Sequence, residues 1–135
     1  MKPAMAETPT DVVTRLLNQV GLANVAEKVG DGMYKIKWGS ATLITGAAGN
    51  GIVAIAPMFS QPPPARREEF YRALLEINAA IGGTAAFAVH KDGTVALQLG
   101  RGVEGLDANE FALMLGAVGK FADQYDDILK AEYYK

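Results

Sequence analysis

The chain has 135 residues, half of them apolar and 21% charged, which is the composition of a globular domain rather than of a disordered segment. It contains no cysteine, which excludes disulfides, thiolate metal sites and cysteine nucleophiles. Thirteen basic against 15 acidic residues give a net charge of −2, so no overall positive charge attracts nucleic acid or an anionic membrane. We expect one domain over residues 1–135, with no nucleic-acid and no membrane partner.

No apolar run approaches the ~20 residues of a membrane-spanning helix. The first seven residues hold one lysine but no apolar stretch typical of a signal peptide. We therefore expect a cytoplasmic protein.

The first element in chain order is a short helix. Thr8 can cap its start, and Asp11, three residues later, completes a capping box. Apolar residues then recur at three- and four-residue spacing from Val12 to Val20. This single apolar stripe predicts a helix that packs against a sheet.

The next 36 residues, from 24 to 59, have the pattern of strands. Asp31-Gly32 is a strong hairpin signal, and Tyr34, Ile36 and Trp38 alternate with lysines, so that one face is buried and the other is exposed to water. The expected strands are residues 25–29, 33–38, 41–45 and 52–56, with a flexible glycine-rich loop over residues 46–51.

The second half of the chain repeats the alternation of helix and hairpin. Three prolines lead into a helix over residues 66–81, a hairpin turns at Asp92-Gly93, and Asp107 caps a final helix of some 20 residues. Because the strands come as hairpins, the sheet is antiparallel. The sequence predicts an α+β fold: an antiparallel sheet of about five strands with three helices, in the order α-β-β-β-α-β-β-α.

No group of residues completes a catalytic, metal or cofactor motif. His90 is the only histidine, and no serine or threonine motif offers it a nucleophile. Asp123, Asp126 and Asp127 share one helix face, but the sequence has no second acidic motif for a cation, and a solvated face is the better interpretation. Glycine-rich segments such as residues 46–51 lack the lysine and the strand–helix placement of a phosphate loop. We expect no enzyme, no metal and no cofactor.

What remains is a surplus of apolar side chains. The helix over residues 66–81 has two neighbouring apolar stripes, more than one packing surface needs. A large core would explain them, but a symmetric dimer is the commonest way to cover such a surface. The expected homodimer contacts are Phe70, Tyr71, Leu74, Leu75 and Ile77.

Three segments give the chain a resemblance to known proteins. They are Leu74-Leu75-Glu76-Ile77-Asn78, the hairpin over residues 86–97, and Gly105-Leu106-Asp107 followed by a long acidic helix. Together with the order of elements, they resemble the Tir-chaperone (CesT-like) family of class I type III secretion chaperones and the YbjN-like proteins of the same fold, over about residues 8–130.

The resemblance implies a small, non-enzymatic homodimer that binds extended segments of a partner protein. On that basis we expect a protein or peptide client, held by the sheet and the first helix. Trp38, Met58 and Phe59 lie near strand ends, where aromatic and methionine side chains suit adaptable peptide contacts, although they could also be ordinary core residues. The alternative function is that of a YbjN-like dimeric regulatory or stress-response scaffold that binds no client.

Overall fold

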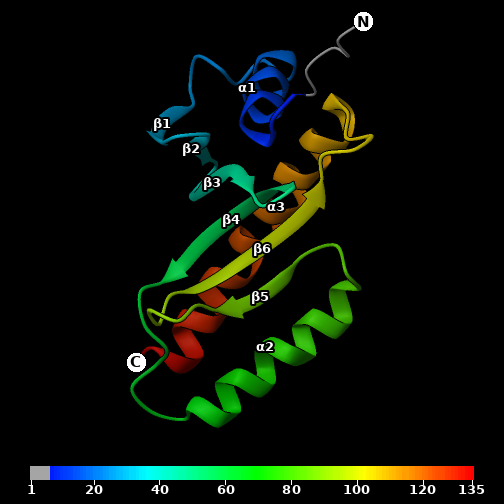
Figure 1. The fold of residues 1–135 in the computed structure, drawn as a ribbon. Helices are drawn as coiled ribbons and strands as arrows, with labels where there is room; N and C mark the ends of the chain where they lie inside the picture. Colours follow the sequence, from blue (N-terminus) through cyan, green and yellow to red (C-terminus); the bar gives the residue numbers. More distant parts are fainter. Residues whose placement is uncertain (1–6) are drawn as a thin grey trace, which may run out of the picture.

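The computed structural model describes residues 7–135, so the segment without a signal-peptide pattern lies almost wholly outside the described residues. In chain order the elements are α1 (Pro9–Gln19), β1 (Glu27–Gly30), β2 (Met33–Trp38), β3 (Ala41–Ala48), β4 (Gly51–Phe59), α2 (Arg67–Ile81), β5 (Ala86–Val89), β6 (Val95–Gly102) and α3 (Ala108–Tyr133) (Figure 1).

The strands form one antiparallel sheet in the order β1-β2-β3-β4-β6-β5. This confirms the α+β class and the antiparallel pairing. All four strands expected between residues 25 and 56 form, so the sheet has six strands, one more than the predicted element order contained.

The flexible loop predicted over residues 46–51 is wrong for most of its length. Residues 46–48 finish β3 and Gly51 begins β4, so only Gly49 and Asn50 make the turn. Gly46 is needed for close approach rather than for flexibility, since a Cβ there would lie 2.5 Å from the carbonyl oxygen of Gly32.

Helices α1 and α3 cover one face of the sheet, and no helix of residues 7–135 covers the other (Figure 1). As the sequence predicted, Thr8 caps α1 in a capping box with Asp11. The side chain of Asp107 likewise accepts a hydrogen bond from the Glu110 N–H at the start of α3. No helix in this described part of the chain has the length and apolar character needed to span a membrane.

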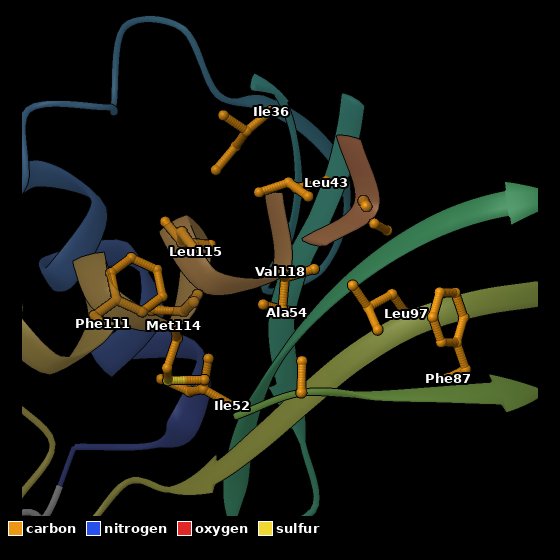
Figure 2. Packing of buried hydrophobic residues seen from close by; sticks show 14 of the residues in the cluster. Ile36, Leu43, Ile52, Ala54, Phe87, Leu97, Phe111, Met114, Leu115 and Val118 are labelled. Atoms are coloured by element: carbon orange, nitrogen blue, oxygen red, sulfur yellow. The ribbon is translucent and has the colours of Figure 1, made fainter. Parts of the chain in front are cut away.

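The hydrophobic core lies between the covered sheet face and α3. Figure 2 shows side chains of the sheet meeting a row from α3. The residues concerned are Ile36, Leu43, Ile52, Ala54, Phe87 and Leu97 on the strands and Phe111, Met114, Leu115 and Val118 on the helix. All of them are buried, so the alternation predicted for β2 places Ile36 on the correct, inward face.

Helix α2 lies along the outer edge of β5 (Figure 1). Asn78 joins the two elements through both ends of its amide. Its Nδ2 donates to the Phe87 carbonyl oxygen at 3.3 Å, and its Oδ1 accepts from the Phe87 N–H at 2.7 Å. The side chain thereby pairs with backbone groups that an edge strand would otherwise leave free.

Candidate partner-binding surfaces

The first surface is a corner between α2 and β5. Tyr71, Leu75 and Val89 are 36%, 67% and 43% exposed and border a hollow that Ala88 also lines. We call these four residues the α2–β5 corner. They form an apolar surface that no other element of the described chain covers.

The structure divides the five predicted dimer contacts between the two sides of α2. Tyr71 and Leu75 are exposed, and Ile77 is half-buried. Phe70 and Leu74, however, are buried inside the protomer because they lie four residues apart on the inner side of the helix. Any contact area with a second chain must therefore come from the outer members of the set.

The second surface begins where β4 leaves the sheet. The register between β4 and β6 shifts between Pro57 and Phe59, which leaves Met58 as the extra residue of a bulge. Met58 and Phe59 are half-buried and line a groove of about 580 Å³. We call it the proline-loop groove, and its lining includes Met58, Phe59, Pro62, Pro64, Arg67 and Tyr134.

Two aromatic side chains build one wall of this groove, Phe59 at the end of β4 and Tyr134 directly after α3. The rings of Phe59 and Tyr134 stack, with centroids 4.1 Å apart and planes at 20°. The Tyr134 hydroxyl donates to the Gln61 carbonyl oxygen at 2.8 Å, and burial raises the pKa of Tyr134 to about 12. Sequence reasoning found no role for Tyr134, because only the fold brings the chain end to residue 59.

Arg66, the residue directly before α2, makes several contacts with other side chains. Arg66 has a left-handed backbone (φ 58°), and its guanidinium contacts Glu69 at 2.9 Å and Glu132 at 3.0 Å and lies 4.9 Å from the Tyr133 ring centroid. These hydrogen bonds raise the pKa of Arg66 and lower that of Glu69. The contacts tie the start of α2 to the end of α3.

Trp38, the last residue of β2, lies against the middle of α3. Its indole packs on Gly119 of α3, and one turn further along α3 the Ser40 hydroxyl donates to Asp123. Ser40 and Met58 line a common small hollow of about 200 Å³, so Met58 borders this hollow as well as the groove. The structure thus brings Met58 and Phe59 together and places Trp38, half-buried, beyond the hollow.

The third surface is the free edge of β1, which sequence reasoning did not single out. All four residues of β1 are exposed, and it pairs only with β2. Val25, two residues before the strand, is 64% exposed and Val29, within it, is 50% exposed, which is unusual for valines at a strand. The only signal in the sequence was the poor alternation of this strand, where apolar and charged residues do not separate into two faces.

A groove between α1 and the start of the sheet adjoins this edge. It is lined by Thr14, Leu17, Asn18, Ala23, Ala26 and Tyr34. The hydroxyls of Thr14 and Tyr34 lie 3.0 Å apart and hydrogen-bond across its floor. The β1 edge therefore offers free backbone N–H and C=O groups. Beside it lies a partly apolar groove that also contains the hydroxyls of Thr14 and Tyr34.

The structure shows the surroundings of the residues that the sequence analysis considered as catalytic or metal-binding candidates. The exposed His90 ring has its Nε2 2.8 Å from the side-chain oxygen of Gln98, an amide rather than an orienting carboxylate. Over residues 7–135 no three potential ligands gather as a metal site would require.

The family follows from comparison with known proteins. The family model of the Tir chaperone protein (CesT) family matches residues 12–120, and the chain belongs to this family. Members are non-enzymatic chaperones, which confirms both the resemblance to this family and the expectation that the protein is not an enzyme. None of the curated proteins matches the sequence, and the resemblance to YbjN-like proteins stays a prediction.

Solved structures show the same fold at low sequence identity. A chain of the HopA1–SchA chaperone–effector complex matches with a TM-score of 0.67 at 10% identity, covering 91% of this chain and 99% of that one. A chain of the heterodimeric ExoU–SpcU complex from the type III secretion system of Pseudomonas aeruginosa matches at 0.67 and 13%, covering 87% and 97%. A chain of the ExsC–ExsE complex matches at 0.65 and 13%, covering 89% and 92%.

Proposed function

We propose that the protein is a homodimeric chaperone that binds an extended, apolar-rich segment of a partner protein through the β1 edge and the groove beside α1. The observation that carries this function is the free edge of β1 with two exposed valines, 64% and 50% accessible. An added strand would pair with the free backbone groups, which demands little of the partner's sequence.

The shape of the edge favours a specific partner over indiscriminate pairing. β1 has only four residues, and its register with β2 shifts between Lys28 and Gly30, so Val29 lies in a bulge. Short, bulged edges resist pairing with arbitrary strands. A client segment would need apolar side chains at the spacing that reaches Val25, Val29 and the hollow at Tyr34.

The neighbours in structure support a protein client. The complex of HopA1 and SchA is a chaperone–effector complex, and ExoU–SpcU comes from a type III secretion system. Because this chain belongs to the same family of chaperones and has the same fold, we expect its client to be an effector protein as well.

The dimer would be formed at the α2–β5 corner. Tyr71, Leu75 and Val89 present an apolar surface whose burial against a second copy removes it from water. A two-fold axis at this corner would leave the β1 edge of each protomer free, because β1 and β5 are the opposite edges of the sheet.

We assign Met58, Phe59 and Trp38 a supporting part in client binding. All three are half-buried, and Met58 borders both the proline-loop groove and the small hollow beside Ser40. A client long enough to leave the β1 edge would meet Trp38 first, because Trp38 ends the strand that pairs with β1.

The test is affinity capture of the tagged protein from its own cell extract, with identification of the bound chains. The double variant Val25→Asp and Val29→Asp should lose the client. Leu113→Asp should keep it, since Leu113 is equally exposed at 65% but lies on α3. Equal recovery by all three proteins would refute binding at the β1 edge, and a dimer without any client would favour the scaffold function.

The dimer has a separate test. Light scattering during size-exclusion chromatography at micromolar concentration should give twice the mass of the 14.3 kDa chain. Leu75→Asp should reduce it to one chain without changing the circular dichroism spectrum. A single-chain mass for the wild type, unchanged on concentration, would refute the homodimer.

A further inference from the structure

Two adjacent arginines at the start of α2 have opposite surroundings. Arg66 is fully engaged by Glu69, by Glu132 and by the Tyr133 ring. Arg67 makes no ion pair with any of the residues 7–135. Its Nε donates to the Pro63 carbonyl oxygen at 2.8 Å, which holds the side chain at the groove and leaves the terminal nitrogens of its guanidinium available.

The groove that Arg67 lines is otherwise mainly apolar. Phe59 and Tyr134 form a stacked aromatic wall, and Pro62 and Pro64 form a stiff rim that loses little conformational freedom on binding. The volume of about 580 Å³ is enough for two or three side chains of a peptide. The first turn of α2 holds two carboxylates, of which Glu69 is engaged by Arg66 and Glu68 makes no ion pair with Arg67 in the described chain.

We infer that the proline-loop groove binds an apolar–acidic pair of neighbouring residues in the partner's extended segment, with the carboxylate on Arg67 and the apolar side chain on the Phe59–Tyr134 wall. This inference rests on the proposed function, because it names the chemistry that one part of the client must carry.

The charge of Arg67 decides the occupant. A guanidinium without a carboxylate partner, fixed by its Nε, presents two N–H groups to a carboxylate in the geometry of a bidentate pair. A basic segment would be repelled, and a purely apolar one would leave the charge unpaired beside it. The groove thus selects acidic over neutral segments of the same shape.

The test uses dipeptide probes, so it does not depend on knowing the client. The ¹⁵N-labelled full chain is titrated at pH 7 with N-acetyl-phenylalanyl-glutamate amide and with its glutamine counterpart. We expect the amide signals of Phe59, Ser60, Arg67 and Tyr134 to shift, with the glutamate probe binding about threefold more tightly. N-acetyl-alanyl-glutamate amide should bind more weakly than the phenylalanyl probe, because it lacks the ring.

Matched variants assign the effect to one side chain. Arg67→Gln should abolish the preference for glutamate, and Arg67→Lys should keep part of it. Arg72→Gln removes the same charge from the exposed side of the same helix, where Arg72 faces Glu76, and should leave the preference intact. The spectrum of each free variant shows whether it is folded.

Three results would overturn the inference: shifts away from the groove, equal affinities for the two probes, or an unchanged preference in Arg67→Gln. If these occur while Val25→Asp with Val29→Asp still abolishes capture of the client, the inference fails and the proposed function survives. If wild type discriminates between the probes but captures no client, the proposed function fails at its own test.

Discussion

The two edges of the sheet are treated in opposite ways. At β5 the edge is covered by a helix, and the amide of Asn78 makes two hydrogen bonds to the backbone of Phe87. At β1 nothing in the described chain covers the edge, and Val25 and Val29 remain largely exposed. An uncovered edge presents backbone groups with which another chain can pair, and this is the property on which the proposed client binding at β1 rests.

The difference shows how a single sheet can separate two partners. The covered edge brings α2 outward and gives it an apolar outer surface, which suits a rigid, symmetric contact. The free edge is short and bulged and suits an extended chain. Each feature that closes β5 can be removed singly, and each removal should make that edge behave more like β1.

The largest effect should come from Phe70→Ala. Phe70 is fully buried, and its ring lies 5.2 Å from the ring of Tyr133 and 6.5 Å from that of Phe59. Truncation should cost about 3–5 kcal/mol of unfolding free energy, measured by chemical denaturation, and should accelerate hydrogen exchange in β5. Arg72→Ala, on the exposed side of the same helix, should cost under about 1 kcal/mol. A loss below about 1 kcal/mol for Phe70→Ala would show that α2 is held by other contacts.

Next in size is Asn78→Ala, which removes both hydrogen bonds to Phe87. We expect a loss of about 1–2 kcal/mol, because water can reach part of the edge once the amide is gone. The Phe87 amide should exchange faster and the protein should aggregate more readily at high concentration. Asn18→Ala is the control, since the Asn18 amide donates only to Thr14 of its own helix and should matter by less than about 0.5 kcal/mol.

On the β1 side of the sheet, Trp38 of β2 packs against α3, and substitutions at two glycines of α3 test that contact. A Cβ at Gly119 would lie 2.8 Å from Cγ of Trp38, whereas one at Gly116 would lie 3.8 Å from Cζ2. Gly119→Ala should displace the indole, shift its fluorescence and cost about 1–3 kcal/mol. Gly116→Ala should be neutral or should stabilise the helix by up to about 1 kcal/mol. Equal effects would mean that the indole does not occupy this notch.

The sequence predicted elements more successfully than surfaces. Capping residues and hydrophobic periodicity located α1, α2 and the start of α3 because those signals are local. The loop predicted at residues 46–51 failed because Gly46 serves an approach of β2, a contact that no local pattern reveals.

The surfaces depended on long-range contacts. The periodicity of α2 could not say which stripe faces inward, so Phe70 and Leu74 were grouped with Tyr71 and Leu75. The proline-loop groove needed residue 134 beside residue 59, and nothing in either segment indicates the other. Burial of an amphipathic helix was predictable, but its orientation required the whole chain.

The smallest expected effect is the loss of stability at acid pH that comes from the Arg66–Glu69 ion pair at the start of α2. The Arg66 guanidinium, chiefly through its hydrogen bond, lowers the pKa of Glu69 below its ordinary value of 4.5. A lowered folded-state pKa means that this contribution to stability is complete above pH 4.5 and is lost as the pH falls through the folded-state value. Both side chains are largely exposed, so the effect should be small and should vanish in about 1 M salt.

The measurement is the thermal midpoint at pH 6 and at pH 3 in low salt. Glu69→Gln should show a smaller fall between these pH values than the wild type, because glutamine cannot be protonated. Glu76→Gln, which alters an exposed pair on the same helix with 3.4 Å between its atoms, is the matched control and should leave the fall unchanged. Hydrogen exchange should place the acid-induced loosening in the first turn of α2. If Glu69→Gln and Glu76→Gln behave alike, Arg66 does not hold the first turn of α2 through Glu69, and the closure of the β5 edge depends on the Arg66–Glu132 contact, the aromatic contacts and Asn78.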